Sequence, residues 1–281
     1  MLLELAIGDA YGAGFEYVSN KIVRERNDLS TYIRHQRHNI PPGHYTDDTQ
    51  MSIALAELIV SGEEWSRENI AKYFVDVFKR DIREGYASRF YNFLLKVKDG
   101  DDFLKNIRPE SDKSGAAMRA GVVGLFSDID EVIEKTTIQA QVTHNTKGGI
   151  NSAVAAALMV HYFYYKKGTV SELQDFLIEY VYEDWSVLWR GKVGAKGIMS
   201  VKAAYTALIS CRSMSELLIK CIAFTGDVDT VATIALAAAS LSDEYEQDIP
   251  QNLIDDLETG KYGRDYLIEL DKRLFEKINE E

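Results

Sequence analysis

The helical spacing of apolar residues, with few prolines to interrupt it, most limits how this chain can fold. Proline occurs only at positions 41, 42, 109 and 250 of the 281 residues, so long stretches lack the residue that breaks helices. Apolar side chains recur three or four residues apart along most of the chain, as in helices with one buried face. Alternating apolar and polar residues, which are typical of strands, are scarce. The sequence therefore predicts an all-α protein of about ten to thirteen helices.

The expected helices are separated by short connections that contain Gly, Asn, Asp or Ser, which is typical of turns. They cover residues 50–61, 70–79, 87–97, 116–126, 131–141, 150–165, 170–182, 201–209, 214–223, 231–241 and 263–278. Residues 153–160 and 231–239 are apolar on nearly all sides, so we expect both segments to be buried centrally. No linker rich in Pro, Gly or Ser divides the chain, and we expect a single domain over residues 1–281.

The composition limits the class of partner. Apolar residues make up 46% and charged residues 27% of the chain, which is ordinary for a globular protein with a buried core. The net charge is −12, and no stripe of Lys and Arg is interleaved with aromatic residues. A broad nucleic-acid groove is therefore disfavoured. A small phosphate site stays possible, because backbone N–H groups bind phosphate without net positive charge.

The expected location is the cytoplasm. Cys211 and Cys221 cannot form a disulfide framework and lack the spacing of metal ligands. The segment Met1 to Ile7 is short and contains Glu4, unlike a signal peptide. No run approaches the ~20 apolar residues of a membrane span. We expect a soluble monomer that does not enter a membrane.

Two acidic segments each lead into an apolar helix. Residues 43–50 read Gly-His-Tyr-Thr-Asp-Asp-Thr-Gln, and residues 226–230 read Gly-Asp-Val-Asp-Thr. Asp and Thr before a helix are commonly N-caps. A cap needs only one carboxylate, however, and two neighbouring acids at a buried helix start repel each other unless a cation neutralises them.

The same segments match the chemistry of a metal site. Carboxylate and hydroxyl oxygens are ligands for Mg²⁺ or Mn²⁺, whereas the His and Cys patterns of zinc sites are absent. If the segments meet in space, they supply four carboxylates and at least two hydroxyls, enough for two divalent cations. The residues are Thr46, Asp47, Asp48, Asp227, Asp229 and Thr230.

Two further stretches could complete a pocket. Residues 8–16 are rich in glycine and end in Glu16. Glycines let a backbone approach a ligand closely, although close helix packing is the alternative. Ser114 and Gly115 precede the helix expected from Ala116, where free N–H groups can hold a phosphate. The alternative there is an ordinary cap, with Arg119 in solvent.

The histidines carry weaker signals. His144 precedes the helix expected from Ile150, and a single histidine there is either a capping or core residue or a ligand-binding one. His35 and His38 lie in a polar, Arg-rich segment that we expect to be a surface loop.

Five motifs in order resemble the ADP-ribosylglycohydrolase family, which includes ADP-ribosylarginine hydrolases and the dinitrogenase reductase-activating glycohydrolase. They are Gly-Asp-Ala-x-Gly-x-x-x-Glu from residue 8, Thr-Asp-Asp-Thr from 46, Gly-Ala-Ala-Met-Arg from 115, Thr-His at 143–144 and Gly-Asp-x-Asp-Thr-Val-Ala from 226. The resemblance runs from about Ile7 to about Pro250. Each motif is weak alone, whereas five in order form a strong signal.

The resemblance implies an all-α orthogonal bundle with two Mg²⁺ or Mn²⁺ ions at the floor of a cleft. It implies the metal ligands named above. Glu16 matches an acidic residue near the metals, and Glu16 and Asp48 are the candidate catalytic acids. Ser114, Gly115 and Ala116 match the loop that holds the diphosphate and distal ribose, and His144 matches a histidine against the ligand.

The implied reaction is hydrolysis of the bond between C1 of the distal ribose and an acceptor, which releases ADP-ribose through an oxocarbenium-like transition state. The partner is then an ADP-ribosylated protein or small molecule, and the acceptor stays open among arginine, serine, a nucleic-acid base and a small molecule. The alternatives are a binding protein that keeps the cleft without turnover, and a hydrolase of another ribosyl or phosphoester compound.

The chain departs from the family pattern at several positions. It has Ser114 where the family usually has Asn, and Thr225 and Val228 within the last motif. Asn145-Thr146 follows His144, where Pro-Asp is frequent. None of these changes removes an expected metal ligand, but they alter the phosphate loop and the lining of the cleft.

Overall fold

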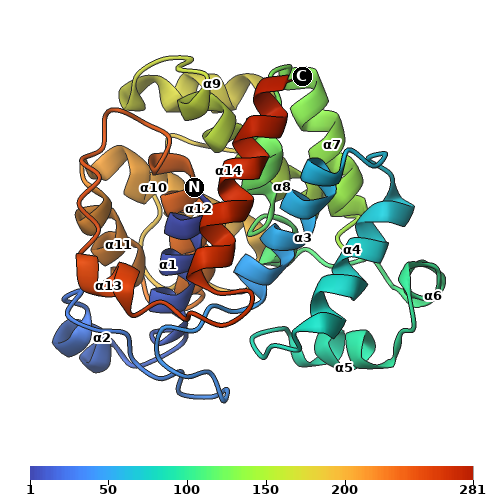
Figure 1. Ribbon diagram of the computed structural model, residues 1–281. Helices are drawn as coiled ribbons and strands as arrows, with labels where there is room; N and C mark the ends of the chain where they lie inside the picture. Colours follow the sequence, from blue (N-terminus) through green and yellow to red (C-terminus); the bar gives the residue numbers. More distant parts are fainter. Residues whose placement is uncertain (281) are drawn as a thin grey trace.

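Helices make up the whole framework of this computed structural model, which describes residues 1–280 (Figure 1). Within that range there are fourteen α-helices, three short 3-10 helices and no β-strand, which confirms the all-α prediction. The α-helices are α1 Leu2–Ala13, α2 Asn20–Arg26, α3 Asp47–Ser61, α4 Arg67–Arg80, α5 Ser88–Lys96, α6 Gly100–Asn106, α7 Ile129–Gln141, α8 Lys147–Tyr164, α9 Leu173–Tyr180, α10 Gly197–Ser210, α11 Met214–Ala223, α12 Val228–Ala239, α13 Gln251–Asp255 and α14 Arg264–Glu280. The 3-10 helices are η1 Ser114–Ala116, η2 Ala120–Leu125 and η3 Val170–Glu172.

The close packing of α1 against α12 lies at the centre of the fold (Figure 1). Every residue of α12 is buried. Gly8 and Gly12 lie one turn apart on α1. A Cβ at Gly8 would be 2.8 Å from the carbonyl oxygen of Ala232, and one at Gly12 would be 2.4 Å from the Cα of Asp229. The glycine-rich stretch therefore serves helix packing, the alternative that the sequence left open.

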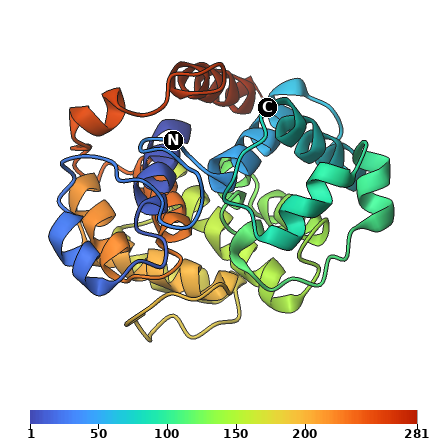
Figure 2. The same cartoon turned by 90° about the horizontal axis from the view of Figure 1, so that it is seen from below.

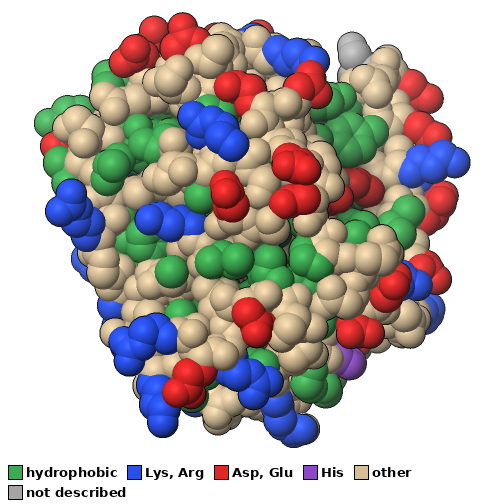
Figure 3. All heavy atoms as spheres, turned by 90° about the vertical axis from the view of Figure 1, so that its left-hand side faces the viewer, with side chains coloured by type: hydrophobic (Ala, Val, Ile, Leu, Met, Phe, Trp, Pro, Cys, Tyr) green, Lys and Arg blue, Asp and Glu red, His purple; other side chains and the backbone are tan. Residues whose placement is uncertain are grey.

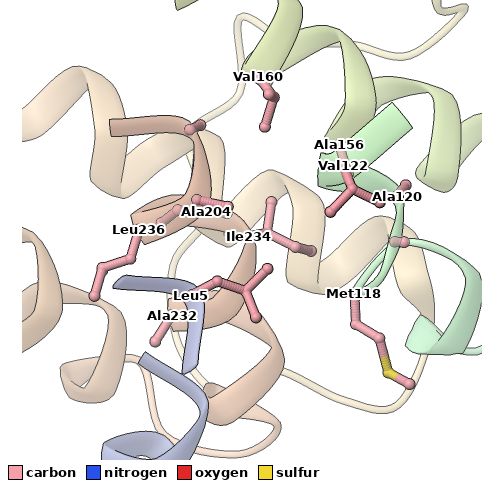
Figure 4. Close-up of a cluster of buried hydrophobic side chains, with 14 of the residues drawn as sticks. Leu5, Met118, Ala120, Val122, Ala156, Val160, Ala204, Ala232, Ile234 and Leu236 are labelled. Carbon is pink, nitrogen blue, oxygen red and sulfur yellow. The ribbon is translucent and has the colours of Figure 1, made fainter. Parts of the chain in front are cut away.

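Small and branched side chains fill the space around this pair. In Figure 4, side chains such as Leu5 from α1, Val160 from α8, Ala204 from α10 and Ile234 from α12 point toward one another. They belong to one continuous cluster of buried apolar residues. Residues 153–160 are all buried as well, so both segments expected at the centre lie there.

Outer helices cover this core with one apolar face each. On α14 the buried residues are Leu267, Leu270, Leu274 and Ile278, which share one face because they are spaced three or four apart. Helix α14 crosses the front of the molecule in Figure 1 and packs on α1 and α3. From below, α4 to α6 lie across from α1, α2 and α11 (Figure 2). In Figure 3, acidic, basic and apolar side chains are mixed over the visible face.

The structure differs from the sequence-based helix prediction in one expected helix and in four helices that were not expected. Residues 116–126 form parts of η1 and η2 rather than one α-helix. Here the chain passes so close to α8 that a Cβ at Gly124 would lie 2.2 Å from the carbonyl oxygen of Ala157, and glycines also weaken an α-helix. Helix α1 was not among the expected helices, and neither were the short helices α2, α6 and α13. None of the described helices is both long enough and apolar enough to cross a bilayer.

Replacing Gly12 with Ala tests the close approach of α1 and α12. The added methyl group would meet the backbone of Asp229, so we expect the free energy of unfolding to fall by about 1–3 kcal/mol despite alanine's higher helix propensity. Gly260→Ala is the matched control, since nothing lies within 4 Å of its Cβ position. Urea unfolding of both variants measures the difference; equal stabilities would contradict the packing argument.

Candidate metal centre and ligand cleft

The two acidic segments meet in one cleft of about 950 Å³, which is the condition on which the expected metal site depends. Asp47 and Asp48 reach it from the start of α3, and Asp227, Asp229 and Thr230 reach it from the start of α12. Of the other predicted site residues, Glu16, Ser114, Gly115 and His144 also line this cleft. Thr46 and Ala116 are buried beside it and do not line it.

Asp9 holds the start of α3 in place, a role that the sequence analysis did not identify. Its side chain is fully buried and accepts hydrogen bonds from both the backbone N–H and the hydroxyl of Thr46 and of Thr49. The four distances lie between 2.6 and 2.9 Å. Thr46 caps α3 in turn, accepting from the backbone N–H of Asp48. One carboxylate of α1 thus positions Asp47 and Asp48 at the cleft.

The pKa values of the four aspartates in the cleft are all raised, so each carboxylate ionises less readily than usual. Burial, with the negative charge of neighbouring acids, raises the pKa of Asp47, Asp48 and Asp229 well above the usual range. Burial and the charge of Glu16 raise the pKa of Asp227 to about 6. A bound cation would remove this cost, because it favours the ionised carboxylate.

The arrangement of oxygen atoms fits a divalent cation. Asp48 Oδ2 is buried and has no hydrogen-bond partner among the described residues. Carboxylate oxygens of Glu16, Asp227 and Asp229 lie within 4.8 Å of one another. An unpartnered buried oxygen beside a convergent carboxylate group is what a hard cation such as Mg²⁺ or Mn²⁺ would satisfy.

Unusual backbone geometry directs the second acidic segment. Thr225 and Gly226 both adopt positive φ, at 63° and 96°. Only glycine fits at 226, because a Cβ there would lie 1.9 Å from the carbonyl oxygen of Val193. The same carbonyl accepts from the N–H of Asp227 at 3.2 Å. This turn aims Asp227 and Asp229 into the cleft.

The proposed phosphate loop is a single 3-10 turn against His144. The backbone N–H of Ser114 donates to Ala195 O at 3.1 Å, and its hydroxyl contacts Asp227. Gly115 leaves room for the imidazole, since a Cβ there would be 2.9 Å from His144 Cε1. The carbonyl of Ala116 accepts from Gln139 Nε2 at 3.0 Å, inside the core.

A chain of hydrogen bonds sets the tautomer of His144. Arg119, expected in solvent, is buried; its Nη2 donates to Thr143 Oγ1 at 2.8 Å. The Thr143 hydroxyl lies 2.6 Å from His144 Nδ1. Burial, together with the charge of Arg119, lowers the pKa of His144 to about 3, so the ring is neutral. Because Thr143 Oγ1 accepts from Arg119, its single hydroxyl proton is free to donate to Nδ1; we infer this arrangement, in which the proton of His144 is on Nε2.

Burial also lowers the pKa of Arg119 to about 9, so this side chain keeps its positive charge at neutral pH. Its guanidinium lies over the ring of Phe74, 4.4 Å from the centroid. No local sequence pattern distinguishes this arginine from a solvent-exposed one, because its partners come from α4 and α7 and the turn that follows α7.

Glu16 is held by the segment that precedes α3. His35 was expected on a surface loop, but its side chain is only 1% exposed, and its Nε2 lies 2.7 Å from Glu16 Oε2. His35 Nδ1 accepts from the backbone N–H of Arg37 and His38, at 3.0 and 3.1 Å. Nε2 must therefore carry the proton and donate to Glu16. Although Glu16, His35 and His38 lie close enough to hold a metal, this tautomer offers a cation no lone pair at Nε2.

Comparison with known proteins identifies a family and a fold. The profile of the family described as ADP-ribosylglycohydrolase matches residues 1–281. The chain is 29% identical over 177 residues to ADP-ribosylhydrolase ARH3 of Gallus gallus, covering 55% of this chain and 47% of that protein. The chain thus spans about half the length of this relative. It is 26% identical over 315 residues to ADP-ribosylhydrolase ARH3 of Xenopus tropicalis, covering 89% and 88%.

A solved structure shares the fold. The structure titled "ADP-ribosylglycohydrolase-related protein complex" superposes with a TM-score of 0.76 at 20% identity. The match covers 99% of this chain and 96% of that one.

The raised carboxylate pKa values predict how a divalent cation stabilises the protein. The pKa values of Asp47, Asp48, Asp227 and Asp229 are higher in the folded protein than in the unfolded chain. The folded protein therefore loses stability as the pH rises from about 4, the unfolded pKa, through the pKa values of the folded state. We therefore expect the metal-free melting temperature to fall from about pH 5 to about pH 8. The gain in the free energy of unfolding that Mg²⁺ or Mn²⁺ produces at a fixed concentration should grow over that range. It reaches about 2.7 kcal/mol where the cation is at about a hundredfold excess over its Kd.

Thermal unfolding with EDTA, and then with each cation, measures this increment. NaCl at equal ionic strength controls for screening. An increment that stays constant or shrinks with rising pH would contradict binding at these carboxylates.

Proposed function

Because the chain belongs to the ADP-ribosylglycohydrolase family, we propose that it hydrolyses the bond between C1 of the distal ribose of ADP-ribose and an acceptor, releasing ADP-ribose. The observation that carries the proposal is the convergence of Asp47, Asp48, Asp227 and Asp229 with Glu16 in one cleft. The partner would be an ADP-ribosylated protein or small molecule. This reaction would reverse ADP-ribosylation of the acceptor.

Six residues would hold two divalent cations, Mg²⁺ or Mn²⁺. They are Thr46, Asp47, Asp48, Asp227, Asp229 and Thr230. Thr46 Oγ1 donates its proton to Asp9 and keeps a lone pair on its oxygen, and Thr230 hydrogen-bonds to Asp48. Bound cations would supply Lewis acidity and a template for the vicinal ribose hydroxyls.

Glu16 faces the acidic site as an acceptor of hydrogen bonds. His35 Nε2–H faces one of its oxygens at 2.7 Å, and Arg37 faces the other at 3.1 Å. Both partners are donors, so the carboxylate in this arrangement accepts on both oxygens. Such a group can take a proton from attacking water or stabilise positive charge developing on the ribose. Asp48 is the second candidate for proton transfer.

His144 and the turn at residues 114–116 would bind the diphosphate and distal ribose. The proton on His144 Nε2 is available for donation to a ligand beside Gly115. The Ser114 N–H is already bonded to Ala195 O. The backbone N–H groups that this turn would offer are therefore those of Gly115 and Ala116, which have no partner within the turn. Contacts remote from the reacting carbon would position it against Glu16.

The alternative is an ADP-ribose-binding protein without turnover. The complete carboxylate set and the presence of Glu16 in the cleft favour catalysis. The deciding experiment measures release of ADP-ribose from arginine-, serine- and nucleic-acid-linked substrates with Mg²⁺ or Mn²⁺, and then with EDTA. Cation-dependent release from any linkage supports the hydrolase; binding of ADP-ribose without release from any of them supports the alternative.

Removing one cation-binding carboxylate should stop turnover without unfolding the protein. We expect Asp47→Ala and Asp229→Ala each to lower the rate by about a hundredfold or more, since each loses an oxygen ligand. Each change also removes one of several repelling buried charges, so the metal-free melting temperature should not fall. Asp101→Ala, at an exposed position of α6, is the control. Full activity in Asp47→Ala or Asp229→Ala would disprove the assigned ligands.

Thr143→Val tests the hydrogen bonds that orient His144. The valine cannot donate to His144 Nδ1 or accept from Arg119, so the imidazole loses its fixed tautomer. We expect the Kd of ADP-ribose, measured by calorimetry, to rise about fivefold or more, consistent with loss of about 1 kcal/mol. Thr143→Ser keeps the hydroxyl and should bind like the wild type. Equal binding by the two variants would show that the tautomer is set by other contacts.

A further inference from the structure

A carboxylate and an aromatic ring form a niche for a guanidinium group on the cleft wall. Glu16 Oε1 lies 3.1 Å from Arg37 Nη2, and the Arg37 guanidinium carbon lies 4.6 Å from the centroid of the Tyr17 ring. An ion pair to a carboxylate combined with an aromatic face is the chemistry that recognises a planar guanidinium. In this structure, the occupant is the chain's own Arg37.

The walls of the niche are held independently of this occupant. Glu16 keeps its contact with buried His35 through the other oxygen. Tyr17 is fixed at a positive φ of 52°, and its backbone N–H donates to Gly226 O at 2.9 Å. Gly226 belongs to the turn that presents Asp227. The niche therefore stays intact and attached to the acidic site when Arg37 moves away.

Arg37, in contrast, is weakly held. Its side chain is 52% exposed, and it lies on the connection between α2 and α3. Exposed ion pairs and exposed cation–π contacts each contribute little stability. A competing guanidinium could therefore displace this side chain at modest cost.

The niche lies where an acceptor would leave. Glu16, Tyr17 and Arg37 line the same cleft as Asp48 and Asp229. Because Glu16 is a candidate catalytic group, the acceptor bonded to the ribose carbon must lie next to it during cleavage.

We propose that Arg37 is a specificity-determining residue that occupies the guanidinium niche in cis and thereby selects against arginine-linked ADP-ribose. This inference rests on the proposed function. An arginine acceptor must displace Arg37 from Glu16 and Tyr17. A neutral, oxygen-linked acceptor such as serine needs no such displacement, so the wild-type protein favours it.

The test compares Arg37→Met with the wild type on serine- and arginine-linked ADP-ribosyl peptides of otherwise equal sequence. Methionine keeps an unbranched apolar side chain and removes the guanidinium. We expect the ratio of kcat/KM for the arginine-linked to the serine-linked peptide to rise about five- to tenfold, mainly through KM, because the two contacts are individually weak. Arg34→Met is the matched control: Arg34 is exposed on the same segment and hydrogen-bonds to Asn39.

A second measurement uses agmatine, a free guanidinium compound, as a probe. Calorimetry should show tighter agmatine binding by Arg37→Met than by the wild type, again by about five- to tenfold. Arg34→Met should match the wild type.

The outcomes separate the two proposals. An unchanged substrate ratio with unchanged agmatine binding overturns the role of Arg37. Equal loss of activity on both linkages also overturns it, because Arg37 would then only position Glu16. If no linkage is hydrolysed by the wild type, the proposed function fails, and agmatine binding still decides whether Arg37 fills the niche.

Discussion

The four hydrogen bonds that Asp9 accepts from Thr46 and Thr49 are the interaction on which the site depends. They tie the first helix to the start of α3, while Gly12 on the same helix lets the backbone of Asp229 approach. Helix α1 therefore sets the distance between the two acidic segments. A buried carboxylate is costly unless donors surround it. Here two of the donors are backbone N–H groups that the N-terminal turn of α3 leaves free, and the other two are threonine hydroxyls. The same contacts thus give the buried Asp9 carboxylate its hydrogen-bond partners and position Asp47 and Asp48.

The acidic site is built at the expense of stability. Several carboxylates with raised pKa values share a buried region, and Tyr17 and Thr225 adopt backbone conformations that non-glycine residues rarely take. Such features persist where the surrounding structure overdetermines them. The packed helices α1, α3 and α12 provide that support. A cation would convert the mutual repulsion of the carboxylates into binding energy.

Fixed tautomers at two histidines give the cleft a defined pattern of donors. Thr143 and Arg119 leave the proton of His144 on Nε2, and two backbone N–H groups do the same for His35. His35 then acts on Glu16, whereas His144 faces the turn at Gly115. Because these orientations come from neighbouring groups, the cleft is arranged before any ligand arrives, which reduces the entropy lost on binding.

The sequence by itself determined the all-helical class, the buried segments 153–160 and 231–239, and the two acidic segments as candidate ligands, because periodicity and charge density are local properties. That the two acidic segments meet in one cleft was decided by the tertiary structure, since they lie about 180 residues apart. The assigned roles of the individual site residues stay predictions. Only the tertiary structure decided that Asp9 holds α3, that residues 116–126 do not form one helix, and that Arg119 and His35 are buried. The partners of these residues are supplied by segments distant in sequence or by the close passage of another helix. No local pattern records such contacts, and burial changes the chemistry of a side chain without changing its identity.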